Sequence, residues 1–137
     1  MAAAIEVQAG NLKRPLVVLI AEDEILIRWA LADELRGFGW DIIEVATADD
    51  AIEVLQTAIE VDLVVADVNM PGRANGFDLA AFVIRERPWV KVVIMSGHAR
   101  PQDRSERLFD IFVAKPFDER ELGEQLRSLL VGNTGAD

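Results

Sequence analysis

The chain has 137 residues, 51% of them hydrophobic, which suits one compact domain with a buried core and leaves no room for a second full domain. There is no cysteine, so disulfides and thiolate metal sites are excluded, and no apolar run reaches the roughly 20 residues that a membrane-spanning helix needs. The formal net charge is −10 and the basic residues are scattered, which disfavours direct binding to nucleic acid and favours protein partners. We therefore expect a cytoplasmic protein that does not enter a membrane.

Five short apolar runs, each of strand length, alternate with segments of helical periodicity. The expected strands span residues 16–21, 40–45, 63–66, 90–95 and 111–114. Residues 1–14 lack a sustained period and are expected to form an N-terminal arm, and residues 132–137 a short tail. The folded domain is therefore predicted to span residues 15–131.

The first three helices are expected between these strands. The first spans residues 24–36, and the third runs from Gly76 until Pro88 prevents its continuation. The second is predicted to begin with a pair resembling a capping box, Thr47 and Asp50. Its buried face is expected to carry Ala51, Val54, Leu55 and Ala58.

Two more helices are expected in the last third of the chain. A weakly amphipathic fourth helix is predicted over residues 100–108. The last helix is capped by Asp118, its entry is held by packing of Phe117 on Leu122, and it stops at Gly132. Five strands alternating with five helices predict a doubly wound five-stranded parallel α/β sheet, with helices on both faces.

Carboxylates follow two of the predicted strands. Asp67 ends the run 63–66 and precedes turn-forming residues, and an isolated aspartate in such a place often does no more than cap a turn. Glu22 and Asp23 follow the first strand, where adjacent carboxylates repel unless a cation lies among them. The alternative for Asp23 is that it caps the next helix.

A flavodoxin-like strand order of 2-1-3-4-5 would open the tips of strands one, three, four and five onto one crevice. That order would bring together Glu22, Asp23, Asp67, Ser96 and Lys115. Carboxylates with a backbone carbonyl suit Mg²⁺ better than Zn²⁺. Because phosphoryl transfer needs mainly positioning and charge neutralisation, the set predicts a phosphoryl acceptor, with Asp67 as the nucleophile.

At this point the chain resembles a known family, the receiver domains of two-component response regulators, over residues 15–131. The motifs that carry the resemblance are Ala21-Glu22-Asp23-Glu24, Val65-Ala66-Asp67-Val68-Asn69-Met70-Pro71-Gly72, Ser96-Gly97 and Val113-Ala114-Lys115-Pro116-Phe117. The resemblance implies that Asp67 accepts a phosphoryl group from a sensor histidine kinase or phosphotransfer protein. It also implies that Mg²⁺ is bound by Asp23, Asp67 and the Asn69 carbonyl, with Glu22 acting through water.

The resemblance implies roles for further residues. Lys115 would contact a phosphoryl oxygen, the Ser96 hydroxyl would move to the phosphoryl group, and Phe112 would swing inward behind it. Asn69 and His98 occupy the positions that tune phosphoryl lifetime in the family. The plainer alternatives are an ordinary rim aromatic for Phe112 and a solvated loop residue for His98.

The combined reading is a stand-alone phosphoacceptor module that switches binding to an unidentified downstream protein. Two alternatives stay open: a receiver-like adaptor that does not use phosphorylation, and a phosphatase with an aspartyl-phosphate intermediate. Phosphatases of the haloacid dehalogenase type usually carry a second aspartate where Asn69 stands. The family also allows a homodimer through the fourth and fifth helices, although the segment between Ser96 and Lys115 is short for the family and predicts a shortened fourth helix.

Overall fold

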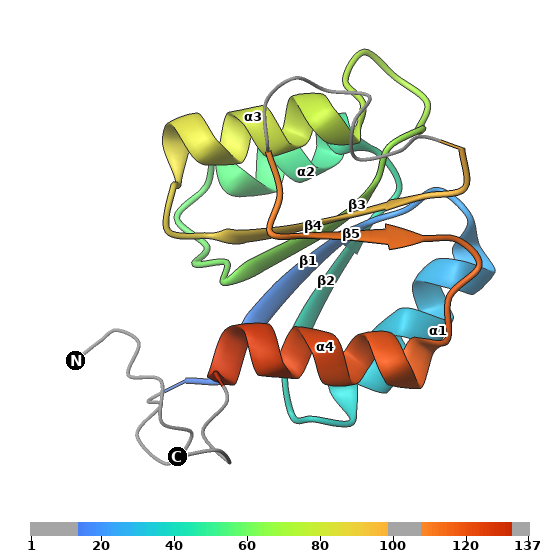
Figure 1. Cartoon of the computed structure of the whole chain (residues 1–137). Coiled ribbons are helices and arrows are strands. Elements are labelled where there is room, and N and C mark those ends of the chain that lie inside the picture. Colours follow the sequence, from blue (N-terminus) through green and yellow to red (C-terminus); the bar gives the residue numbers. More distant parts are fainter. Residues whose placement is uncertain (1–13, 99–107, 133–137) are drawn as a thin grey trace.

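A computed structural model of the chain describes residues 14–98 and 108–132. The strands are β1 (Val17–Ala21), β2 (Asp41–Val45), β3 (Leu63–Asp67), β4 (Lys91–Ser96) and β5 (Ile111–Ala114), and the helices are α1 (Ile25–Arg36), α2 (Ala48–Leu55), α3 (Gly76–Glu86) and α4 (Glu119–Val131). All neighbouring strands pair in parallel, in the order β2-β1-β3-β4-β5. The predicted fold class and strand order are confirmed (Figure 1).

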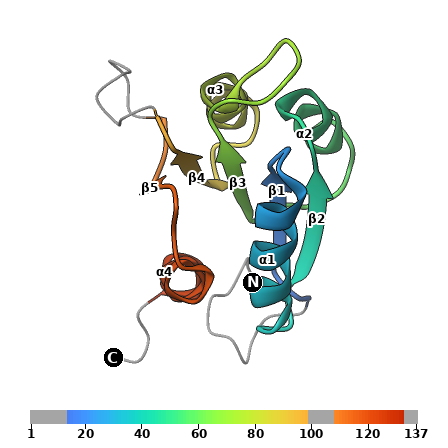
Figure 2. The same ribbon diagram turned by 90° about the vertical axis from the view of Figure 1, so that its right-hand side faces the viewer.

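Helices cover both faces of the sheet: Figure 2 shows α2 and α3 on one side and α1 and α4 on the other. One apolar cluster joins α2 and α3 to one face, with Leu55, Leu79 and Val83 among its buried members. The other joins α1 and α4 to the opposite face through Leu35 and Leu126. The central strand β3 is buried throughout, which agrees with its continuous apolar sequence.

The sequence located the elements to within a residue or two, with one exception. Helix α2 ends at Leu55, and Ala58 is exposed beyond it, so the prediction that Ala58 lines the buried face was wrong. The N–H groups of Gln56 and Thr57, just after α2, donate to carbonyls three and four residues earlier and close the helix in a turn. The fourth predicted helix, at residues 100–108, lies almost entirely outside the described residues.

Side-chain caps fix several of the helix starts. Thr47 accepts a hydrogen bond from the Asp50 N–H at 3.0 Å, and Asp118 accepts one from the Glu121 N–H at 2.9 Å, as predicted. At α3 a complete capping box occurs that the sequence analysis missed, in which Asn75 is the cap. Within the described ranges, no helix is both long and apolar enough to cross a bilayer.

Candidate functional site

Strand register places the polar residues at one edge of the sheet. Ala21 pairs with Ala66, and Asp67 pairs with Met95, one residue before Ser96. The chain continues the pairing beyond β5, because the Lys115 N–H donates to the Ser96 carbonyl at 2.9 Å. The tips of β1, β3, β4 and β5 therefore carry the five residues that the sequence predicted to meet.

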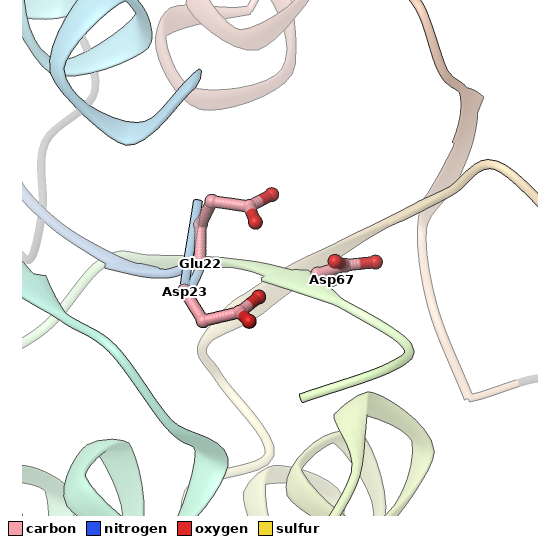
Figure 3. A group of neighbouring side chains, drawn as sticks. All are labelled: Glu22, Asp23 and Asp67. Carbon is pink, nitrogen blue, oxygen red and sulfur yellow. The ribbon is translucent and has the colours of Figure 1, made fainter. Parts of the chain in front are cut away.

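Three carboxylates converge at this edge (Figure 3). Ligand oxygens of Glu22, Asp23 and Asp67 all lie within 4.8 Å of one another. Glu22 is fully buried and Asp67 is 7% exposed, whereas Asp23 is open to solvent. Helix α1 begins after Glu24 without a side-chain cap from the described residues, so Asp23 does not serve as the cap that we considered. We define these three carboxylates as the acidic cluster.

Lys115 is the cation that the acidic cluster requires. Its Nζ lies 2.7 Å from Glu22 Oε1 and 3.0 Å from Asp67 Oδ2. Burial alone would lower the pKa of Lys115, but the close negative charges of Glu22 and Asp67 outweigh it and the pKa is raised. The pKa of Glu22 is also raised, because complete burial and the nearby Asp67 charge outweigh the attraction of Lys115. The ammonium therefore stays charged between two carboxylates that it does not fully compensate.

The segment between β1 and α1 is held by groups that the sequence analysis missed. Arg28 donates from Nη1 to the Glu22 main-chain carbonyl at 2.9 Å and from Nε to Glu44 at 3.1 Å. Glu44, on β2, also pairs with Arg36 at 3.0 Å. Because Arg28 and Glu44 lie 16 residues apart and meet only across two elements, no local sequence pattern reveals their pairing.

The backbone of Asp67 is packed against the start of α3. The Gly76 N–H donates to the Val68 carbonyl at 2.9 Å, and a Cβ at Gly76 would lie 2.3 Å from the Asp67 carbonyl oxygen. Only a residue without a side chain fits there. Asn69, two residues after Asp67, is exposed in the loop that joins β3 to α3. The sequence analysis used Gly76 only as a helix start and missed this contact.

The remaining predicted residues lie on β4 and β5 or directly after β4. Ser96 is 2% exposed, and its Oγ accepts a hydrogen bond from the N–H of the exposed His98 at 3.1 Å. Phe112 is half-buried, and its ring centroid lies 5.5 Å from that of Phe109. The functional roles of Ser96, His98 and Phe112 stay predictions.

Comparison with known proteins shows the family. Residues 18–127 match the model of the response regulator receiver domain. The chain is 36% identical over 113 residues to the transcriptional regulatory protein PdtaR of Mycobacterium tuberculosis, covering 79% of this chain and 53% of PdtaR. It is 32% identical over 116 residues to the aerobic respiration control protein ArcA of Escherichia coli K12, covering 82% of this chain and 48% of ArcA. The chain thus spans about half the length of these relatives.

Solved structures of response regulators have the same fold as this chain. The response regulator TrrA of Thermotoga maritima, in complex with Mg²⁺-BeF, matches with a TM-score of 0.75 and 28% identity over 84% of this chain and 99% of TrrA. A CheY-like receiver domain of Methanospirillum hungatei shares the fold with a TM-score of 0.77, at 20% identity, over 90% of this chain and 100% of its own. This chain belongs to the receiver domains of two-component response regulators, which are phosphoacceptor signalling modules. The family assignment favours this class over the phosphatase.

Proposed function

We propose that Asp67 accepts a phosphoryl group from the phosphohistidine of a sensor histidine kinase or phosphotransfer protein. An Asp67 carboxylate oxygen would form the new O–P bond as the P–N bond breaks, and the imidazole nitrogen would keep the electron pair. The observation that carries the proposal is the position of Asp67 at the tip of β3, beside two further carboxylates and 3.0 Å from the Lys115 ammonium. This arrangement combines a nucleophile with a fixed cation for the transferring group.

The acidic cluster fits a hard divalent cation. Each of the three carboxylates offers an oxygen within 4.8 Å of the others, and carboxylate oxygens are the protein ligands that Mg²⁺ prefers. We assign Asp23, Asp67 and the Asn69 carbonyl as direct ligands and Glu22 as a ligand through water. A bound Mg²⁺ would neutralise charge on the phosphoryl oxygens, and the TrrA structure, which is a complex with Mg²⁺-BeF, supports a Mg²⁺ site in this chain.

Phosphorylation would change the balance of charge around Lys115. The acyl phosphate would carry about two negative charges, in place of the single charge of the Asp67 carboxylate, and three acceptor oxygens beside an ammonium that now contacts Glu22 and Asp67. We propose that Lys115 and the buried Ser96 hydroxyl bind those oxygens. Phe112, which is only half-buried, would move inward, and Asn69 and His98 would tune the lifetime of the phosphoryl group. The altered surface would then select a downstream protein.

A protein donor is supported by the surface next to the site. Ile25, Leu26 and Trp29 are large apolar side chains on the first two turns of α1, directly after the acidic cluster, and Trp29 is 51% exposed. Exposed apolar side chains grouped in this way are typical of protein interaction surfaces. A donor that covered these residues would bring its phosphohistidine beside Asp67. A homodimer of the receiver stays a prediction.

The test is intact-mass analysis after incubation with acetyl phosphate, with and without Mg²⁺. Wild type should gain a single, acid-stable and base-labile phosphoryl group that depends on Mg²⁺. Asp67→Asn should gain none. Asp50→Asn is the matched control, because Asp50 is an exposed carboxylate outside the acidic cluster, and it should label as wild type does. Mg²⁺ binding without any adduct would refute the proposal and favour the adaptor that does not use phosphorylation.

A further inference from the structure

The loop of residues 68–75, which joins β3 to α3, is fastened at both ends. At its start the Val68 N–H donates to the Met95 carbonyl at 3.0 Å. At its end Asn75 and Asp78 exchange two hydrogen bonds of 2.9 Å in the capping box of α3. Between these points the chain arches beyond the edge of the sheet, on the side of α2 and α3 (Figures 1 and 2). The exposed Asn69 lies in this arch.

A third attachment comes from α2. Asp49 Oδ2 accepts a hydrogen bond from the Arg73 N–H at 2.9 Å, across 24 residues of sequence. Asp49 is the second residue of α2, and the neighbouring Thr47 cap fixes that first turn. Met70 and Ala74 pack against the apolar core. Within residues 69–74, the Arg73 N–H is the one main-chain group with a hydrogen bond to another described residue.

The loop approaches Asp49 so closely that its sequence is restricted there. Gly72 has a φ of +108°, in the region that favours glycine. A Cβ at Gly72 would lie 2.3 Å from Asp49 Oδ2, the same oxygen that Arg73 uses. The backbone at Gly72 and the Asp49 carboxylate therefore form one close contact.

We propose that Asp49 is a positioning residue for the metal and phosphoryl site. By holding Arg73, its carboxylate keeps the arch in the conformation that presents the Asn69 main-chain carbonyl to the acidic cluster. Asp49 itself would touch neither the cation nor the phosphoryl group. This inference rests on the proposed function, since it takes the Asn69 carbonyl as a Mg²⁺ ligand.

The chain offers a matched control. Asp50 is the next residue in the same helical turn, carries the same charge near the same helix N-terminus, and its exposed side chain has no hydrogen bond to the described residues. Asp50→Ala therefore reproduces the loss of charge and of helix-dipole stabilisation without touching the loop. Asp49→Asn keeps an acceptor oxygen for Arg73 and removes only the charge.

The experiment measures amide hydrogen exchange at Arg73 and the Mg²⁺ dissociation constant, in the full chain, for wild type and for Asp49→Ala, Asp50→Ala and Asp49→Asn. In Asp49→Ala we expect Arg73 to exchange faster and the dissociation constant to rise about tenfold, as is typical when a partner that orients metal ligands is lost. Asp50→Ala should match wild type in both readings. Asp49→Asn should stay within about twofold of wild type in Mg²⁺ affinity, because a neutral acceptor keeps most of the hydrogen bond.

Equal Mg²⁺ affinities of Asp49→Ala and Asp50→Ala would overturn the inference, as would an Arg73 amide that is unprotected in wild type. Asp49→Asn behaving like Asp49→Ala would also overturn it, because the charge rather than the hydrogen bond would then matter. Failure of the proposed function would be seen in wild type itself, which would then bind no Mg²⁺ or would bind it without gaining a phosphoryl group. The exchange of Arg73 would still decide whether Asp49 holds the loop.

Discussion

Gly76 supports the backbone of the phosphoacceptor, and replacing it with alanine tests how closely the site depends on that support. The added Cβ would lie 2.3 Å from the Asp67 carbonyl oxygen and 2.9 Å from both the Asp67 carbonyl carbon and the Val68 Cα. Ordinary contacts begin at 3.4 Å, so the start of α3 and the end of β3 must separate by about 1 Å. All three contacted atoms belong to the main chain and cannot rotate away.

Two opposing effects determine how Gly76→Ala changes the free energy of unfolding. Alanine in place of glycine, where the conformation permits it, stabilises a protein by about 0.4–1 kcal/mol. Overpacking against a rigid neighbour costs about 1–3 kcal/mol, and main-chain contacts belong at the upper end. We expect Gly76→Ala to lose about 2 kcal/mol of stability. A 1 Å displacement of Asp67 should also slow labelling by acetyl phosphate by about 100-fold.

Gly123→Ala is the control. Gly123 lies inside α4, and its Cβ would meet the Glu34 side chain at 3.1 Å, which can move aside. This variant should be as stable as wild type or more so, and should label at the wild-type rate. Urea denaturation gives the free energies of unfolding, and intact mass against time gives the labelling rates. If Gly76→Ala matched Gly123→Ala in both, the contact with the Asp67 backbone would not constrain the site.

Three further predictions concern the charges of the site. Lys115→Met should lose about 2–3 kcal/mol of stability without Mg²⁺, because two buried carboxylates lose their cation. Thermal unfolding of wild type and variant, with and without Mg²⁺, measures this loss. A loss of stability that Mg²⁺ does not reduce would contradict the prediction. Asp23→Asn should stabilise the metal-free protein, because it removes one of three repelling carboxylates, and should weaken Mg²⁺ binding measured by calorimetry. The pKa of Glu22 is raised by burial from its ordinary value of 4.5, so the stability that protonated Glu22 provides is complete below that pH and is lost as the pH rises through the raised value. Denaturation of the metal-free protein at a series of pH values should show this fall in wild type and less of it in Glu22→Gln.

The sequence predicted those parts of the site that depend on strand order alone. Asp67 and Ser96 end apolar runs, and parallel pairing brings the ends of such runs to one edge, so their meeting follows from the order 2-1-3-4-5. The end of α2 was misjudged because the apolar spacing continues to Ala58 while the backbone leaves the helix after Leu55. The capping box at Asn75 had a readable signal, an asparagine three residues before an aspartate, that was overlooked.

Other parts could not be read from the sequence, because they depend on distances between separate elements. Arg28 reaches Glu44 only where α1 crosses β2, and Asp49 reaches Arg73 only where α2 approaches the loop after β3. Each of these residues has an ordinary place on a helix, strand or loop when taken alone. Their pairing depends on how separate elements are placed relative to one another, which periodicity within one element does not specify.

The charges of the site give a physical reason for the order of binding events. With all groups ionised, the three carboxylates and the Lys115 ammonium sum to −2, so a negatively charged phosphoryl donor would be repelled. A divalent cation would bring that sum to zero, and the raised pKa of Glu22 indicates that the metal-free cluster already resists full ionisation. Metal binding should therefore precede phosphoryl transfer. The new dianion on Asp67 would again leave an excess of negative charge, and the Lys115 ammonium, 3.0 Å from Asp67, and the Ser96 hydroxyl at the tip of β4 lie at the same edge of the sheet and could bind it. A movement of the tips of β4 and β5 toward Asp67 would then be the direct electrostatic consequence of phosphorylation.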